Sequence, residues 1–358
     1  PRGVRKVERI DPLHVDALRV RDGLLSALSG GPALALTEIP DQLIPENIAL
    51  LIETGGSTGA AKIVALSSDA LRASARLSNT ALGATTTDRW SLSLPLHHIA
   101  GINQLLRSID LGTDPVNEGG EFISIVPTQL YRALREKDKF FDQLLHAKKV
   151  LIGGAALPQQ LLDQGRAAGV SLVTSYGMTE MCGGCVYDGK PLPGVDIKIT
   201  NTGRIALRGP MRAEGYFGNV TATTEVFVDD WFITSDAGEI SESGQLFVHG
   251  RIDDVIISGG EKISPTAVAD VLRSHYPNTE LYLIGVPDEE WGQALRCVMI
   301  TSDESKRMDL GEIREIVGAA FGKVAAPRSL LLLSATPIKS NGKLDLHQLM
   351  TLPPTQSL

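Results

Sequence analysis

The chain has 358 residues, of which 43% are hydrophobic, so it is long enough to build about two domains with cores of their own. Its net charge of −8, from 34 Lys and Arg against 42 Asp and Glu, argues against general binding to nucleic acid or to an anionic membrane surface. No apolar run approaches the roughly 20 residues of a membrane span, and the N-terminal stretch has no signal-peptide core. We therefore expect a cytoplasmic globular protein whose anionic ligands bind in a local basic pocket.

The first half of the chain alternates predicted strands and helices. Apolar periodicity predicts helices at 12–29, 69–83 and 102–112, and strands at 47–54, 89–94 and 122–126. A further helix follows Pro127, with Thr128 placed to cap it. Residues 148–180 read as a strand, a Gly-Gly turn, a helix opened by Pro158, a stop at Gly169 and a second strand, which predicts a βαβ crossover.

The second half of the chain has a different pattern of predicted secondary structure. Short strand-like pieces bounded by Gly, Asp or Asn predict a β-rich subdomain over about 190–251. Amphipathic helices at 264–276 and 310–322, around strands at 279–286 and 296–301, then give an α+β pattern. We expect the tail, LPPTQSL, to be frayed.

A glycine-rich loop follows the predicted strand at 47–54. The stretch ETGGSTGAAK, residues 53–62, suits a phosphate, because glycines let N–H groups turn toward an anion while hydroxyls and a lysine add donors and charge. It is not the loop of P-loop ATPases, which requires G-x-x-x-x-G-K-[ST], because two alanines separate Gly59 from Lys62. A plain turn is the alternative, and the loop alone does not decide between them.

Two other turns carry candidate chemistry. In a parallel sheet, ligands gather at the carboxyl ends of the strands, so the turns GGAA and SYGMTE should lie side by side, and the glycine-rich loop joins them if its strand belongs to the same sheet. Cys182 and Cys185 form a C-x-x-C motif, but two more zinc ligands at suitable spacing are missing nearby. Glycines packed against a ligand explain CGGC better than zinc or redox chemistry.

Five segments in order carry a resemblance to a known family. The glycine-rich loop, SYGMTE, WFITSD, GRIDDVIISGGEKISP and SNGKLD together resemble the adenylate-forming acyl- and aryl-CoA synthetases, from about residue 45 to 346. The resemblance implies an α/β fold: a large N-terminal domain of mixed or parallel sheets flanked by helices, with a β-rich subdomain, and a small mobile α+β C-terminal domain. It implies a first domain at 1–251, a hinge at 252–254 and a C-terminal lid domain at 255–358.

The resemblance implies an acid–thiol ligase that uses ATP, Mg²⁺ and CoA. A carboxylate attacks the α-phosphorus of ATP, giving an acyl-adenylate and pyrophosphate, and CoA thiol then displaces AMP. PLHHIAG with Arg107, and GGCVYDGKPLPGV, are similar to the members that act on 2-succinylbenzoate in menaquinone biosynthesis. The alternatives are an adenylating enzyme for another aryl or acyl acid, which loads a carrier protein, and a nucleotide-binding relative without catalysis. A homodimer is compatible with this reading.

Nucleotide-binding positions follow from the family pattern. The β- and γ-phosphates would be held by Thr54, Gly55, Ser57, Thr58, Gly59 and Lys62. The purine would approach the backbone at Gly153, Gly154 and Ala155, and adenine would contact Gly177 and Tyr176, with Tyr176 stacked on it. The ribose would be bound by Asp236 and Arg251. Thr179 would donate to phosphate and Glu180 would hold magnesium, since a hard cation prefers carboxylate oxygen. Ala61 and Ser235 are departures from the usual proline and glycine of the family.

The remaining positions concern the acid, the thiol and the moving domain. Lys343 would reach the α-phosphate and the attacking carboxylate, Asp253 would be the hinge, and Gly259 and Gly260 would form a wall along the pantetheine arm. His98 would border both the acid pocket and the thiol path, and a metal role for His97 and His98 is improbable at this spacing. Arg107 is either an exposed helix charge or the partner of the second carboxylate of the acid. Ser175, Gly183 and Gly184 would line the aromatic ring.

Overall fold

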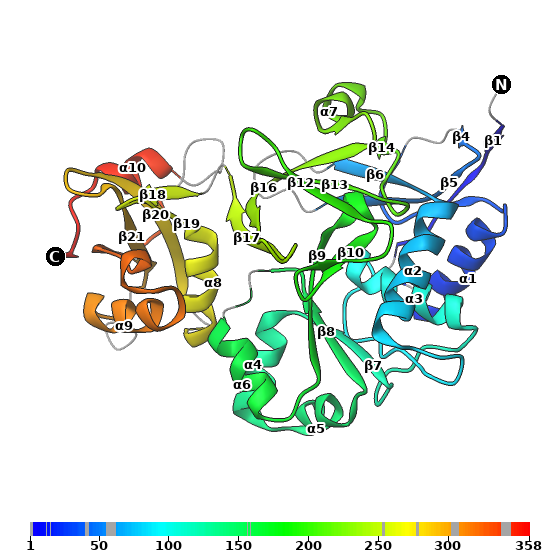
Figure 1. Ribbon diagram of the computed structural model, residues 1–358, viewed down its shortest axis with the longest axis horizontal. Coiled ribbons are helices and arrows are strands. Elements are labelled where there is room, and N and C mark those ends of the chain that lie inside the picture. The colour runs from blue at the N-terminus through cyan, green and yellow to red at the C-terminus, as the bar shows by residue number, and fades with distance from the viewer. Residues whose placement is uncertain are drawn as a thin grey trace. The chain divides into compact units, whose positions relative to one another are not determined.

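A computed structural model gives the structure of the chain. It describes residues 3–11, 13–14, 16–39, 43–54, 62–155, 157, 159–252, 255–276, 279–301, 308–337 and 345–358. The chain forms two compact units (Figure 1). The first comprises Pro1–Gly154, Gly165–Thr234 and Ile240–Phe247, and the second comprises Ala155–Gln164, Ser235–Glu239 and Val248–Leu358. No helix within the described ranges is both long and apolar enough to cross a bilayer.

One sheet of the first unit carries the two ends of the glycine-rich loop. Its strands, in the order β14-β6-β5-β3-β2, are β2 Val7–Arg9, β3 Ala33–Ala35, β5 Ile48–Thr54, β6 Lys62–Ser67 and β14 Gly215–Tyr216. β2, β3 and β5 run parallel, whereas β6 is antiparallel to both β5 and β14. The predicted strand at 47–54 is confirmed as β5, but β6 was not predicted. A small separate ladder pairs β1 Val4–Arg5 with β4 Ile44–Pro45.

A second sheet of the first unit carries the other candidate turns. Its strands, in the order β11-β10-β9-β8-β7, are β7 Phe122–Ile125, β8 Lys149–Gly153, β9 Leu172–Met178, β10 Gly183–Tyr187 and β11 Lys190–Pro191. β7, β8 and β9 are parallel, and α6 Gln159–Ala167 connects β8 to β9, so the predicted βαβ crossover is confirmed. Gly153 lies opposite Ser175, which brings the two turns side by side as expected. β5 belongs to the other sheet. The glycine-rich loop was expected to join these two turns only if its strand lay in the same sheet, and it does not.

The strand predicted at 89–94 is wrong. Trp90 and Ser91 make only isolated bridges, to Phe122 and Val116. The apolar alternation there has a different cause, because Trp90 is fully buried and packs on Phe122 with ring centroids 5.3 Å apart.

The predicted cap at Thr128 is also wrong. The helix α4 Pro127–Glu136 has Val126 as its N-cap, two residues before Thr128. Pro127 stands at the first helical position, where its fixed φ suits the start of a helix, and Thr128 lies inside the first turn. The Val126 N–H donates to the Gln129 side chain at 2.9 Å. This is the hydrogen bond that the third helical residue makes to the N-cap in a capping box.

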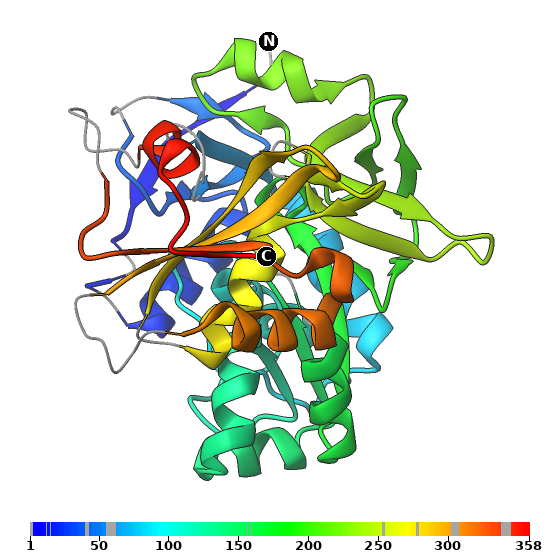
Figure 2. The same cartoon turned by 90° about the vertical axis from the view of Figure 1, so that its left-hand side faces the viewer.

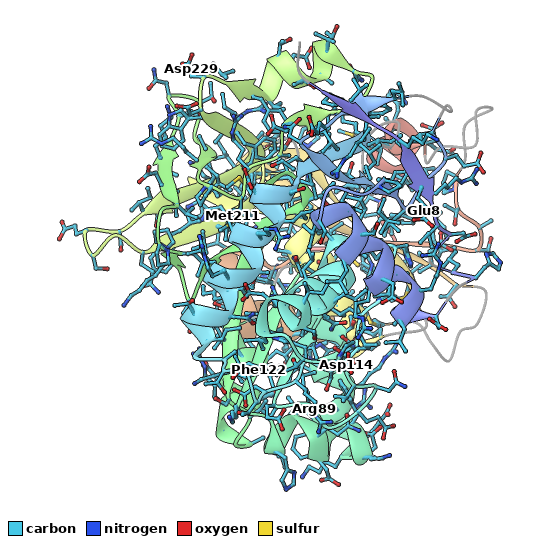
Figure 3. The ribbon with its side chains drawn as sticks, turned by 90° about the vertical axis from the view of Figure 1, so that its right-hand side faces the viewer. Glu8, Arg89, Asp114, Phe122, Met211 and Asp229 are labelled. Atoms are coloured by element: carbon cyan, nitrogen blue, oxygen red, sulfur yellow. The ribbon has the colours of Figure 1, made fainter. Side chains whose placement is uncertain are left out.

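Three helices of the first unit pack together beside these sheets. They are α1 Ala17–Leu28, α2 Ser68–Leu82 and α3 Ile99–Leu111. In Figure 3, α3 is seen between α2 and α1, and α2 contacts β5, β6 and β10. Each predicted helix in this region is confirmed within a few residues. α2 begins at its cap Ser67 and ends at Gly83, whose φ of 72° disfavours a side chain.

The predicted β-rich region follows. Its strands are β12 Asp196–Ile199, β13 Arg204–Arg208, β15 Phe227–Val228, β16 Trp231–Ile240 and β17 Leu246–Arg251, ordered β12-β13-β16-β15 with β17 paired to β16. The short helix α7 Val220–Val226 lies between β14 and β15 in the chain and contacts both. The helices α4 and α5 Lys139–His146 contact each other.

The main sheet of the second unit has helices on both faces. Its strands, in the order β19-β18-β21-β22-β23 with β20 paired to β21, are β18 Ile256–Ser258, β19 Glu261–Ile263, β20 Glu280–Asp288, β21 Gly292–Ile300, β22 Ser329–Leu333 and β23 Gln356–Ser357. α8 Pro265–His275 and α9 Leu310–Phe321 cover one face, and α10 Leu346–Thr351 lies on the other (Figure 2). The tail was predicted to fray, which is wrong, because Ser357 and Gln356 pair with the open edge of β22.

A buried arginine fastens α10 to this sheet. The guanidinium of Arg296, in β21, donates to the carbonyls of Leu349, Met350 and Leu352 at 2.8 to 3.1 Å. Burial lowers the pKa of Arg296, and its charge faces the carbonyl end of a helix, where a cation is favoured.

We expect Arg296→Met to lower the free energy of unfolding of the second unit by about 2 kcal/mol, because three carbonyls lose their donor. Chemical denaturation followed by circular dichroism measures this, with the exposed Lys323→Met as a control that should change stability by less than about 0.5 kcal/mol. Equal stabilities of the two variants would contradict the anchoring role.

Candidate active site

The glycine-rich loop starts and ends on paired strands. Thr54, the last residue of β5, lies opposite Lys62, the first residue of β6, and the Thr54 hydroxyl donates to the Lys62 carbonyl at 3.3 Å. The first and last of the predicted phosphate contacts are therefore adjacent. The other four, Gly55, Ser57, Thr58 and Gly59, lie outside the described residues.

Tyr216 joins this loop to the predicted magnesium ligand. The Lys62 ammonium lies 4.6 Å from the centroid of the Tyr216 ring, and the Tyr216 hydroxyl donates to Glu180 Oε1 at 2.8 Å. Thr179 and Glu180 belong to a 3₁₀ turn, Thr179–Met181, directly after β9. A lysine, an acidic residue and the end of the loop therefore gather at one corner of the first unit.

The chemistry of this corner fits a magnesium ion bound together with phosphates. No group of three or more His, Cys, Asp or Glu that could hold a metal occurs within the described ranges. Magnesium commonly takes one or two protein carboxylates and completes its octahedron with water and substrate phosphates. Glu180 would be that carboxylate, and the Thr179 hydroxyl is next to it in the chain.

The strands β9 and β10 approach each other so closely that only glycine fits. A Cβ on Gly177 would lie 1.9 Å from the Gly183 carbonyl oxygen, and a Cβ on Gly184 would lie 2.1 Å from the Ser175 hydroxyl. Gly153, on the neighbouring strand, has the same relation to Ser175, with its Cβ position 2.5 Å from the Ser175 carbonyl. The predicted ring-lining residues are thus brought together. Backbone contacts alone require glycine at 177 and 153, whereas Gly184 makes room for the Ser175 side chain.

The predicted adenine contacts follow the same strand ends. Tyr176 is half-buried and packs against the first-unit core, so its ring is partly held by protein. Gly154 has a φ of 81° and, like Ala155, is exposed. The pairing of β8 with β9 ends at Gly153 and Ser175, one residue before Gly154 and Tyr176.

Arg107 is buried, so its interpretation as an exposed helix charge is wrong. The side chain is 3% exposed and its guanidinium lies 4.6 Å from the centroid of the Trp90 ring. It donates to the Ser124 hydroxyl at 3.2 Å and weakly to the Tyr187 hydroxyl at 3.5 Å, while Nε has no partner among the described residues. Burial lowers the pKa of Arg107, and the nearby Tyr187 partly offsets this.

The charge of Arg107 is therefore not neutralised by any described carboxylate. An arginine stays protonated in a protein, and a buried cation without an anion costs several kcal/mol. The surrounding wall is polar on the helix side: Ser78 of α2 shares a hydrogen bond with Tyr187 at 2.6 Å, and Asn103 of α3 donates to the Cys182 carbonyl at 2.8 Å. Within the described residues, the partners of Arg107 are hydroxyl groups and an aromatic ring, with no anion among them.

His98 stands at the start of α3. It is exposed at the N-cap position and its ring lies 4.1 Å from that of His97. Desolvation, and then the neighbouring His97, lower the pKa of His98, which favours the neutral form of its imidazole.

The predicted ribose ligands lie on one hairpin. β16 carries Asp236 and β17 ends at Arg251, and the Ile252 N–H donates to the Ser235 carbonyl at 2.7 Å, which places the two ligands on neighbouring strands. Arg251 Nε is buried and has no hydrogen-bond partner within the described ranges.

Gly259 and Gly260 form the turn between β18 and β19. A Cβ on Gly259 would lie 2.4 Å from the Trp291 ring, and both glycines have positive φ, of 57° and 86°. This contact gives Gly259 a reason to be glycine that the sequence did not reveal. Asp253 and Lys343 lie outside the described residues.

The cysteines of CGGC are not placed for thiol chemistry. Cys182 and Cys185 are both fully buried, and desolvation raises the pKa of Cys185 to about 12 and also raises that of Cys182. Reactive cysteines are accessible and have lowered pKa values, which is the opposite situation. Cys297 of the second unit is likewise buried, and its pKa is raised to about 12.

We expect a thiol reagent at pH 8 to find no rapidly reacting cysteine in the native protein and all three after denaturation. The thiolate is the reacting species and is almost absent at such pKa values. Counting modified thiols by mass spectrometry tests this. Rapid native modification of Cys182 or Cys185 would restore a redox or metal-binding interpretation of CGGC.

Sequence reasoning missed Tyr216, Trp90, Ser124 and Tyr187. Tyr187 could have been found, because the segment CVYDGK could have been predicted to pair antiparallel with the strand that carries Ser175. In the structure, Tyr187 lies opposite Ser175 in the β9–β10 ladder. Tyr216 had none, because its partners come from distant parts of the chain.

Two family models match the chain. The AMP-binding enzyme model matches residues 4–217, and the model of the AMP-binding enzyme C-terminal domain matches residues 267–343. The chain is also 34% identical over 371 residues to a probable 2-succinylbenzoate–CoA ligase of Mycobacterium tuberculosis, with 93% of this chain and 96% of that protein covered. It is 30% identical to the 2-succinylbenzoate–CoA ligase of Bacillus subtilis, over 87% of this chain and 70% of that protein.

Solved structures agree with these matches. The o-succinylbenzoate CoA synthetase of Bacillus subtilis in complex with the acyl-adenylate intermediate OSB-AMP has a TM-score of 0.70 at 27% identity, over 94% of this chain and 81% of that chain. The same enzyme in complex with ATP and a magnesium ion has a TM-score of 0.70 at 26% identity, over 96% and 84%. The family matches span most of the chain, and the corner formed by Lys62, Glu180 and Tyr216, like the buried Arg107, lies within the first of them, so this chain belongs to the AMP-binding enzyme family.

Proposed function

We propose that the protein is an AMP-forming acid–thiol ligase that activates 2-succinylbenzoate with ATP and transfers the acyl group to CoA, a reaction of menaquinone biosynthesis. The names of its relatives support the substrate. The structural observation that carries the proposal is Arg107, a buried guanidinium that has no carboxylate partner among the described residues. 2-Succinylbenzoate keeps its ring carboxylate unreacted, and that group would neutralise Arg107.

Each of these residues would have a separate role in the first half-reaction, the formation of the acyl-adenylate. The aliphatic carboxylate of the acid attacks the α-phosphorus, the bond to pyrophosphate breaks, and the acyl-adenylate forms. Attack on phosphorus depends mainly on alignment and on neutralisation of charge. Magnesium, held by Glu180, would supply positive charge to the phosphates. Lys62 would add a cation at the loop end, and His98 would border the acid.

The second half-reaction needs a different arrangement. The CoA sulfur attacks the acyl carbonyl and AMP leaves. We propose that residues 252–254, with Asp253 as hinge, let the C-terminal part rotate, which removes Lys343 and brings the β18–β19 turn at Gly259 and Gly260 to the thiol path. The boundaries 1–251 and 255–358, the contacts of Asp236 and Arg251 with ribose, and a homodimer remain predictions.

The experiment uses two acids that differ in one group. Pyrophosphate release and thioester formation are measured with ATP, Mg²⁺ and CoA, once with 2-succinylbenzoate and once with the same keto acid lacking the ring carboxylate. We expect kcat/KM to be at least about 10-fold higher for 2-succinylbenzoate. Equal values would refute the substrate assignment, and pyrophosphate release without a thioester would point to a carrier protein as acceptor.

A further inference from the structure

Tyr216 is held in place by contacts independent of its hydroxyl. Its backbone lies opposite Val64 in the β14–β6 ladder, and its N–H donates to the Thr223 hydroxyl at 2.9 Å. The side chain is 8% exposed, and its ring packs edge-on against Phe227 with centroids 5.6 Å apart. A phenylalanine could make all of these contacts, so the fold by itself does not require the hydroxyl.

The polar contacts of Tyr216 reach two opposite charges, the carboxylate of Glu180 and the ammonium of Lys62. Its hydroxyl donates to Glu180 Oε1 at 2.8 Å, and its ring face lies 4.6 Å from the Lys62 ammonium. Donation to one carboxylate oxygen restricts the rotation of the carboxylate, and Oε2 has no donor among the described residues. The same donation enriches the phenol ring in electrons, which strengthens its attraction for the lysine.

We propose that Tyr216 is a positioning residue that orients the carboxylate of Glu180 toward the metal and holds the Lys62 ammonium toward the phosphates. The inference rests on the proposed function, in which Glu180 binds magnesium. Magnesium tolerates little departure from octahedral geometry, so a carboxylate that is already oriented binds it better than one that rotates freely. Residues that orient a metal ligand in this way typically contribute 10-fold to 100-fold, roughly, to metal affinity.

Two substitutions separate the two roles of the side chain. Tyr216→Phe removes the hydroxyl and keeps a ring beside Lys62, whereas Tyr216→Leu removes both. Binding of ATP is measured by isothermal titration calorimetry, once with Mg²⁺ and once with EDTA, which provides a readout independent of turnover. Tyr131→Phe, on the helix α4, is the control that removes a tyrosine hydroxyl elsewhere, one that accepts from Arg135.

We expect Tyr216→Phe to weaken binding of ATP with Mg²⁺ by about 10-fold and to change binding of metal-free ATP much less, because the ring beside Lys62 is kept. Tyr216→Leu should weaken both, because Lys62 also loses its ring. In a Glu180→Gln background, Tyr216→Phe should have no further effect on the magnesium dependence, since the hydroxyl acts through Glu180. Raising the Mg²⁺ concentration should restore adenylate formation by Tyr216→Phe.

Three results would overturn the proposal: no change in Tyr216→Phe, an equal loss of affinity for both forms of ATP, and an undiminished effect in the Glu180→Gln background. Another result would contradict the proposed function on which this inference rests. If Glu180→Gln alone leaves the magnesium dependence of ATP binding intact, then the proposed role of Glu180 is wrong, and the role of Tyr216 falls with it. The single variants therefore distinguish the two failures.

Discussion

Lys343→Ala is expected to slow adenylate formation by about 100- to 1,000-fold, because a cation that neutralises charge developing in the transition state is removed. The second half-reaction should change by less than about 3-fold, because in our proposal Lys343 has left the site by then. Exchange of pyrophosphate into ATP measures the first step. Thioester formation from chemically supplied acyl-adenylate and CoA measures the second.

A matched lysine provides the control for this experiment. Lys323→Ala removes an exposed lysine of the second unit, so it should leave both half-reactions unchanged. If Lys343→Ala reduces both half-reactions equally, the two-arrangement mechanism is wrong and the lysine has a general role in folding or binding. If it reduces neither, residue 343 is not part of the site.

Much of the fold could be predicted because local signals agreed with the tertiary structure. The Gly-Gly turn and the stop at Gly169 marked the βαβ crossover correctly. Local signals failed where distant partners decide: β6, Lys62–Ser67, forms because β5 and β14 pair with it, and β23, Gln356–Ser357, forms because β22 has a free edge. Neither pairing leaves a clear periodicity in such short segments.

The candidate site was predictable in its composition and not in its geometry. The order of the motifs pointed to Lys62 and Glu180, but not to Tyr216, which joins them. Helix α3 misled in another way, because its polar residues Asn103 and Arg107 lie four apart and look like a solvated face. Both are buried, because α3 packs against α2 and β10. Periodicity identifies a polar face and cannot tell whether water or a ligand site covers it.

Arg107→Met should lower kcat/KM for 2-succinylbenzoate by about 100-fold, mainly through KM, because the ring carboxylate would be buried without its partner. Methionine keeps much of the length and volume and can still pack on Trp90, so the native circular dichroism spectrum should be retained. Arg132→Met, which removes an exposed arginine of α4, should change neither parameter.

The keto acid without the ring carboxylate shows whether Arg107 recognises that carboxylate or only supports the structure of the pocket. With the original arginine, that substrate leaves the buried guanidinium unpaired, whereas the variant offers it an apolar wall. The variant should therefore use this substrate at least as well as the original protein does, and the preference for the dicarboxylate should nearly disappear. If both substrates lose the same factor, Arg107 supports the structure of the pocket and does not recognise the carboxylate, because removing a charge pair must affect only the substrate that carries the charge.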